Sequence, residues 1–150
     1  RTVQPPAIML SKFQNLHLGL LIVRVGVGAM FILHGLPKLA GGPETWESIG
    51  KMGMPFLGDG FLPTAMGFLA GLTEAGGGLL LVLGLFFPYA CLALVGVMAV
   101  AFSTKLGEFS GIMDFAYKAG WPLELLIVFA ALFFTGPGKI AFGGKSAAAE

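Results

Sequence analysis

The chain has 150 residues, of which 56% are hydrophobic and only 11% are charged, and its mean hydropathy is +0.87. Because about a quarter of the residues in a soluble domain are charged, this composition predicts an integral membrane protein. The net charge of +1 comes from scattered residues that form no basic patch, which excludes a nucleic-acid partner. The single cysteine, Cys91, cannot form a CxxC pair, which excludes a thiol oxidoreductase with its own dithiol.

Four apolar runs follow one another along the chain. A helix needs about 20 mostly apolar residues to cross a bilayer, and each run reaches or approaches this length. We therefore expect an all-α fold, an integral membrane antiparallel four-helix bundle that forms a single membrane domain over residues 1–150. The third and fourth runs are short and need flanking residues in order to span. The expected spans cover approximately residues 16–36, 63–87, 89–106 and 119–136.

The longest polar stretch, residues 38–62, separates the first two spans and contains the signal of a short helix. In GGPETWESIGKMGMP, Pro43 suits a first helical position, and Glu44 and Glu47 suit the positive end of a helix dipole. We therefore expect a short interfacial helix between spans one and two. Trp46 is typical of an anchor at the lipid headgroups, and the alternative is that this helix covers a site as a lid.

The second half of the chain predicts a hairpin and a final span. Spans two and three are separated only by residues 87–89, which indicates an antiparallel hairpin. A loop over residues 105–120 leads to span four, with Pro122 in its first turn, and a Gly-Pro-Gly segment ends that span. Four spans place both termini on one side. Lys and Arg residues divide equally between the two sides, and the acidic residues of the loops favour cytoplasmic termini.

Two charged residues stand inside apolar spans, Arg24 in the first and Glu74 in the second. A lone charge in hydrocarbon is costly, so two charges of opposite sign are expected to be partners or parts of a polar site. At 100° per residue each shares its helix face with small residues, which predicts close packing of the two spans. Their depths differ by roughly 8 Å, most of which an arginine side chain can cover, so we expect an Arg24–Glu74 pair. This pair either only fixes the contact between the helices or also forms part of a functional site. The small residues are Gly67, Ala70, Gly71, Gly77 and Gly78 beside Glu74, and Gly28 and Gly35 beside Arg24.

A further polar group is expected near the loop-side surface. His34 and Lys38 end span one there, and Glu124 begins span four on the same side. Trp121 and Tyr117 precede Glu124 by three and seven residues, so that one helix face presents an indole, a phenol and a carboxylate. These residues outline a pocket for a molecule with an apolar body and polar ends. The simpler interpretation is that His34 and Lys38 snorkel to the headgroups and that Glu124 complements a helix dipole.

No metal, haem or flavin site is expected in this chain. Its two histidines, His17 and His34, would lie about 25 Å apart on one helix, too far to share an iron. The glycines fall within apolar helices, where helix packing explains them, so no glycine-rich phosphate loop is predicted either.

Three stretches resemble the DoxX family of small four-span bacterial membrane proteins: RVGVGAMFILHGLPKL, GMPFLGDGFLPTAMGFLAGLTEAGGGLLLVLGLF and TGPGKIAF. The resemblance covers residues 18–142. It implies a place in the bacterial inner membrane close to quinone chemistry, because family members are associated with quinone-linked redox complexes, notably as the membrane subunit of a thiosulfate:quinone oxidoreductase. The residues that carry it are Arg24, the ending His34, Gly35 and Lys38 of span one, Glu74 with its following glycines, and Gly136 to Gly138.

The leading expectation is a membrane subunit of a quinone-linked oxidoreductase complex, with the redox cofactors supplied by partner subunits. One alternative is an accessory subunit that packs on a larger membrane enzyme without chemistry of its own. A less favoured one is permeation of a small solute through an oligomer. Expected ligands and partners are a quinone, lipid and other membrane subunits. The expected roles are hydrogen bonding to a quinone carbonyl by Arg24, His34 or Lys38, proton relay by Glu74 or Glu124, and ring contact by Tyr117 and Trp121.

Overall fold

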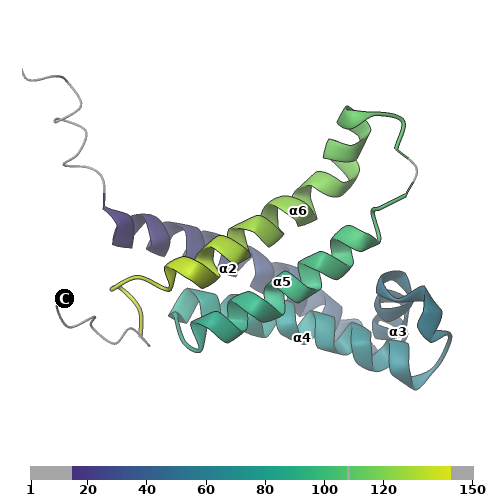
Figure 1. Cartoon of the computed structure of the whole chain (residues 1–150). Coiled ribbons are helices and arrows are strands. Elements are labelled where there is room, and N and C mark those ends of the chain that lie inside the picture. Colours follow the sequence, from purple (N-terminus) through teal and green to yellow (C-terminus); the bar gives the residue numbers. More distant parts are fainter. Residues whose placement is uncertain (1–14, 108, 143–150) are drawn as a thin grey trace, which may run out of the picture.

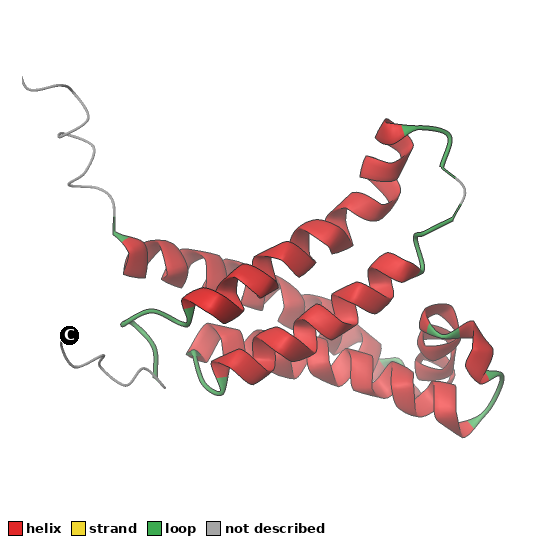
Figure 2. Ribbon diagram, in the orientation of Figure 1, coloured by secondary structure: helices red, strands yellow, loops and turns green. Residues whose placement is uncertain are grey.

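The computed structural model describes residues 15–107 and 109–142, and this part of the chain is helical without any strand (Figure 1). Figure 2 shows long helices joined by short loops. The expected all-α fold is thereby confirmed. The elements are α2 (Leu16–Ala40), α3 (Gly42–Gly53), a short 3-10 turn (Pro55–Leu57), α4 (Phe61–Leu83), α5 (Phe87–Ser103) and α6 (Ile112–Thr135).

Within the described residues, three helices are long and apolar enough to cross a bilayer: α2, α4 and α6, with 25, 23 and 24 residues. Helix α5 is apolar but has 17 residues, a length of about 25 Å, which stands at the lower limit for a span. The chain is therefore a helical membrane protein, and a fourth crossing by α5 stays a prediction. The short helix expected between the first two spans is α3, although its place at the membrane surface also stays a prediction.

Helices α2 and α4 pack backbone to backbone, as their small faces predict. A Cβ atom on Gly28 would lie 2.7 Å from the carbonyl oxygen of Gly78, and one on Gly35 would overlap the backbone of Ala75. Any larger side chain at these crossing points would force the helices apart. The close contact gains dispersion energy along the whole crossing, which is a main source of helix association in lipid.

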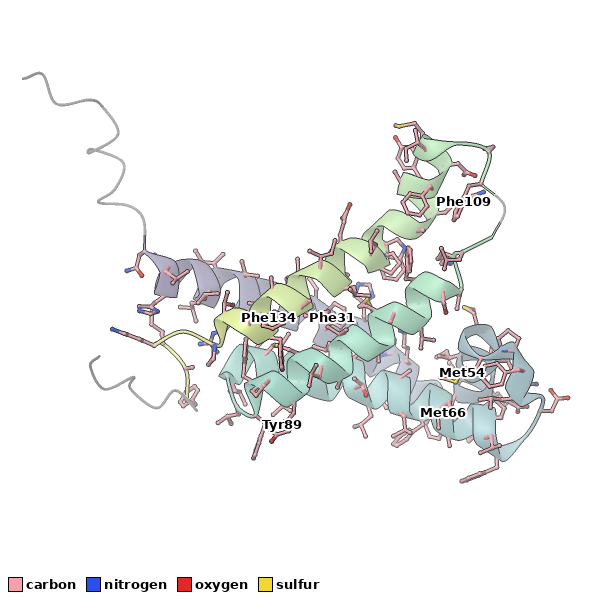
Figure 3. All side chains as sticks on the ribbon, viewed as in Figure 1. Phe31, Met54, Met66, Tyr89, Phe109 and Phe134 are labelled. Atoms are coloured by element: carbon pink, nitrogen blue, oxygen red, sulfur yellow. The ribbon has the colours of Figure 1, made fainter. Side chains whose placement is uncertain are left out.

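Helices α4 and α5 form the expected antiparallel hairpin, with its turn three residues earlier than predicted. Gly84 ends α4 in the left-handed conformation at φ +71°, and its N–H donates to the carbonyl oxygens of Leu80 and Leu81. Phe87 and Pro88 then open α5, where a proline is tolerated because no helical donor is lost. Tyr89 points away from the bundle at this end (Figure 3). The core between α4, α5 and α6 is formed by Leu81, Cys91, Leu94, Met98 and Phe129, all at most 2% exposed.

Besides the shifted hairpin, the end of α2 and the start of α6 differ from the expected boundaries. Helix α2 continues through Pro37 to Ala40, and α6 begins at Ile112, so Pro122 lies inside α6 and not in its first turn. The early start has a local cause, because Asp114 accepts hydrogen bonds from the Ser110 N–H and from Lys118 one turn later. Pro122 removes one helical hydrogen bond, and the first turns of α6 bend away from the axis of the rest (Figure 1).

The glycine contact between α2 and α4 predicts a contrast between two substitutions. Gly35→Ala should lower the free energy of unfolding by about 1–3 kcal/mol, because the new methyl group overlaps the α4 backbone. Gly19→Ala on the same helix meets no atom within 4 Å and should be neutral or slightly stabilising. Unfolding by sodium dodecyl sulfate in mixed micelles measures both, and equal effects would show that this contact does not hold the helices together.

Candidate functional site

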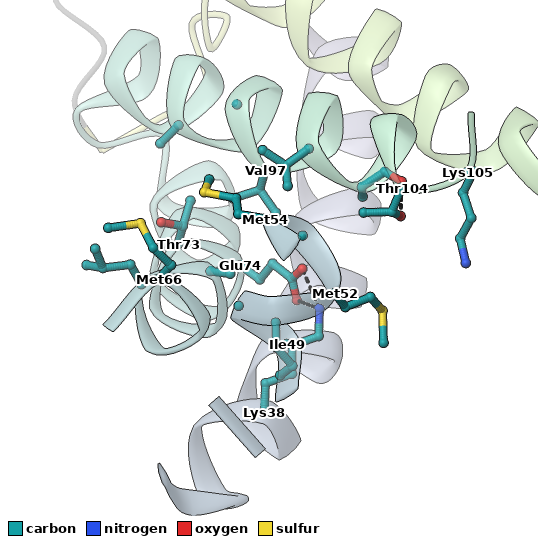
Figure 4. Close-up of a pocket in the computed structure, with 18 of the residues that line it drawn as sticks. Lys38, Ile49, Met52, Met54, Met66, Thr73, Glu74, Val97, Thr104 and Lys105 are labelled. Carbon is teal, nitrogen blue, oxygen red and sulfur yellow. Dashed lines mark hydrogen bonds and ion pairs between the residues drawn. The ribbon is translucent and has the colours of Figure 1, made fainter. Parts of the chain in front are cut away.

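A cavity of about 500 Å³ lies between α3, α4 and α5, at the end of the bundle opposite the α4–α5 hairpin. Its walls are mostly apolar. Met54 from α3's end and Met66 from α4 border it (Figures 3 and 4). Its apolar wall also includes Ile49, Leu69, Ala70, Val97 and Val100.

An ion pair forms the polar part of the cavity wall. The Lys38 ammonium, near the end of α2, lies 2.5 and 2.6 Å from the two carboxylate oxygens of Glu74 in the middle of α4 (Figure 4). The Glu74 side chain is 5% exposed and the Lys38 side chain 34%. Because a buried carboxylate is costly without a partner, the contact with Lys38 offsets part of the cost of burying Glu74. The cavity therefore offers a cation and a carboxylate side by side within apolar surroundings.

The expected Arg24–Glu74 pair is wrong. The glycine contacts fix the register of α2 on α4 so that Arg24 lies beside Leu81 and Val82, at the far end of α4. Val82 is eight residues beyond Glu74, or about 12 Å along the helix, which is more than an arginine side chain covers. The depth estimate failed because the ends of apolar runs do not give the relative shift of two helices.

Arg24 instead joins three segments through backbone carbonyls. Its guanidinium donates to the carbonyl oxygens of Leu81 and Val82 at 3.2 and 3.1 Å, and to that of Ile140 in the segment after α6. The two α4 carbonyls belong to the negative end of the helix dipole, where a cation is stabilised. Arg24 is only 2% exposed and lies far from the cavity. Its contacts match the interpretation that it fixes helix contacts, with backbone carbonyls as partners in place of Glu74.

Helix α3 is held tightly against the start of α4. A Cβ atom on Gly50 would overlap the backbone of Pro63, and one on Gly67 that of Trp46. The Trp46 indole donates to the Lys38 carbonyl oxygen at 2.9 Å and packs edge-on against Phe68. The indole is therefore half-buried against protein, and α3 contributes one wall of the cavity, as the lid interpretation requires.

A charged network fixes the far end of α3 and the loop after it. Lys51 lies 2.8 Å from Glu47 and also pairs with Asp59, while Glu47 accepts a hydrogen bond from the Gly60 N–H. The hydrogen bond from Lys51 lowers the pKa of Glu47 and that of Asp59, and the pKa of Lys51 is raised by the same contacts, Asp59 first. These groups stay charged near neutral pH and tie residues 58–60 to α3.

The structure brings three of the seven expected site residues to the cavity, Lys38, Glu74 and Trp121. Arg24 is at the other end of α4. His34, Tyr117 and Glu124 are exposed on the outside of the helices, with Tyr117 79% exposed. Glu124 lies in the middle of α6 and not at its start, because α6 begins at Ile112.

Sequence reasoning missed most of the cavity wall. Thr73 and Thr104 line it, but isolated threonines in apolar helices carry no signal. Ala93 and Gly96 of α5 also line it, and small residues in a membrane helix predict helix contact as readily as a cavity. The usable signal on α4 was Glu74 itself, a carboxylate in an apolar span.

The ion pair predicts unequal effects of its two single substitutions. Lys38→Met leaves the buried Glu74 carboxylate alone and should lower the free energy of unfolding by roughly 3–5 kcal/mol. Glu74→Gln should cost less, because the partly exposed Lys38 can turn toward the headgroups. The double variant K38M/E74Q should be more stable than K38M, and a double-mutant cycle in mixed micelles measures all three. A larger loss for Glu74→Gln than for Lys38→Met would contradict this account.

Comparison with known proteins identifies the family. The DoxX family model matches residues 19–105, more than half of the chain. A protein of Haemophilus influenzae, described as an uncharacterized protein, is 33% identical over 138 residues, which cover 91% of this chain and 95% of the relative. No solved structure matches. The chain therefore belongs to the DoxX family.

Proposed function

We propose that this protein is the quinone-binding membrane subunit of an oxidoreductase complex in the bacterial inner membrane, with redox cofactors supplied by partner subunits. One observation carries the proposal: an apolar cavity of about 500 Å³ has a buried carboxylate and its lysine in the wall. Ligand pockets typically measure about 300–1,000 Å³, with apolar walls and few polar groups.

The chemistry of a quinone suits such a cavity. A quinone has an apolar ring and tail and two carbonyl oxygens, and its reduction takes up two protons. The cavity rim includes Leu69, Ala93 and Gly96, which are exposed and apolar or small. In a bilayer this side faces lipid, so a lipid-soluble molecule has a direct way in.

Each polar residue then has a role that its position supports. The Lys38 ammonium donates a hydrogen bond to one quinone oxygen, and Glu74 accepts or returns the proton that accompanies electron transfer. Trp121 lies against the ring from the α6 side. Arg24, His34, Tyr117 and Glu124 take no part in this version of the site.

The competing hypothesis is an accessory subunit without chemistry, in which the ion pair only locks α2 to α4. The Glu74→Gln variant separates the two hypotheses within the assembled complex from native membranes. A proton role predicts normal assembly with slowed quinone reduction, whereas a purely structural role predicts poor assembly. Purification of the wild-type complex should also yield redox subunits and bound quinone, and a folded protein that carries neither would overturn the proposal.

Quinone binding can be tested directly on the purified protein, because the chain has two tryptophans and only Trp121 lines the cavity. Decylubiquinone should quench its fluorescence with saturation. The saturable quenching should persist in Trp46→Phe and disappear in Trp121→Phe, since quenching requires close contact.

A blocking variant and its control complete this test. A Cβ atom on Gly96 meets open space on the cavity side, so Gly96→Leu should fill the cavity and weaken decylubiquinone binding at least about tenfold. Gly19→Leu adds the same volume to an open position outside the cavity and should leave binding unchanged. Equal affinity of both variants would place the quinone elsewhere.

A further inference from the structure

Two polar side chains lie on the outside of apolar helices. His34 of α2 and Glu124 of α6 are both exposed. Neither makes an ion pair or a side-chain hydrogen bond to residues 15–107 or 109–142, and the His34 ring has only an edge contact with Phe31. Their polar atoms therefore need a partner that this single chain does not provide within the described residues.

Both residues lie well inside the helices. Glu124 follows the charged residue Lys118 of α6 by six residues, a distance of about 9 Å along the helix. His34 precedes Ala40, the last residue of α2, by six residues and thus by the same distance. An ionisable side chain at this depth is costly against lipid and is usually paired within protein. The simplest way to remove the cost is to cover both residues with another protein surface.

An apolar groove separates the two residues. It has a volume of about 290 Å³, and His34 and Leu125 form parts of its opposite walls. Glu124 precedes Leu125 on α6 and is exposed, on a more outward face of the helix than the groove-lining Leu125. The α2/α6 groove is lined by Gly26, Val27, Met30, Phe31, His34 and Leu125.

His34 and Glu124 lie on the same side of the contact between α2 and α6. The two helices run in opposite directions and cross obliquely (Figure 1), and they meet where Phe31 packs edge-on against Phe129, with ring centroids 4.9 Å apart. From this contact His34 is three residues along α2 toward the loop side, and Glu124 is five residues along α6 toward it. Each residue is therefore within about 8 Å of the contact, measured along its own helix.

We propose that the α2/α6 groove is the interface with a second copy of this chain, in which His34 of each copy pairs with the partner's Glu124. In a two-fold dimer each contact occurs twice, so a contact of His34 with the partner's Glu124 is repeated with the roles of the copies exchanged. A surface that carries both a base and a carboxylate without partners among the described residues is complementary to itself. This inference is independent of the quinone proposal, because none of the groove residues lines the cavity.

Complementary charge variants test the pairing between copies. His34→Glu alone creates two carboxylate–carboxylate contacts, and Glu124→His alone creates two histidine–histidine contacts, so each variant should dimerise about tenfold more weakly than the wild type. When both variants are coexpressed with different tags, every contact of the mixed dimer again joins a histidine and a carboxylate. The two tags should then copurify in lipid nanodiscs, and circular dichroism confirms that each variant is folded.

Cysteine crosslinking in native membranes tests the same geometry with smaller changes. A chain carrying His34→Cys should form a disulfide with a differently tagged chain carrying Glu124→Cys. The control replaces the second chain by one carrying Leu92→Cys, since Leu92 is 52% exposed on α5, away from the groove. The native Cys91 is fully buried and can remain.

Several results would overturn this proposal. A wild-type protein that is monomeric in nanodiscs would do so, as would single charge variants that dimerise like the wild type. The proposal also fails when coexpressed variants stay apart while both are folded, when the Leu92 control crosslinks as well as the Glu124 variant, or when His34→Cys crosslinks to a different protein.

Discussion

The close contact between α2 and α4 determines where the charged residues of these two helices lie. Gly28 against Gly78 and Gly35 against Ala75 set one register between the two helices. In that register Lys38 faces Glu74, and Arg24 faces the end of α4. A shift by one helical turn, about 5.4 Å, would separate the ion pair and move the guanidinium off its carbonyls. The glycines thus determine the register, because the backbones of α2 and α4 can approach this closely only where small residues face each other.

This register explains how the membrane helices hold an arginine that has no carboxylate partner among the described residues. The cation lies at the negative end of the α4 dipole and is further held by the carbonyl of Ile140. The segment after α6 is itself fixed, because the Phe142 N–H donates to the Leu83 carbonyl oxygen. Arg24 therefore connects the segment after α6 to the last turn of α4, and the cavity lies at the opposite end of the bundle.

The sequence predicted which segments are helical and which helices pack together. It was less accurate about where each helix begins and ends, and about how far one helix is shifted along another. Apolar composition indicated the spans, and small residues around Arg24 and Glu74 indicated which faces meet. A hydropathy pattern shows which residues suit contact with lipid, but it does not show where backbone hydrogen bonding of a helix begins or ends. The continuation of α2 past Pro37 and the start of α6 at Ile112 were therefore missed. The shift between α2 and α4 depends on interlocking surfaces on both helices, and a helical wheel of each helix alone contains no such information.

The cavity was harder still to predict, because residues of all five helices line it and one of these helices is the short α3. Charged residues were a sound guide to Lys38 and Glu74, whereas most of the remaining lining residues are apolar and resemble packing residues in sequence. The α3 wall depends on Gly50 and Gly67, where the backbones of α3 and α4 touch.

A bulkier residue at Gly50 or Gly67 would move α3 away and open the cavity while the spans keep their contacts. The spanning helices therefore provide the scaffold, and the connection between the first two spans determines whether a closed site exists. A change confined to this connection would therefore alter the cavity while the fold of the spanning helices is kept.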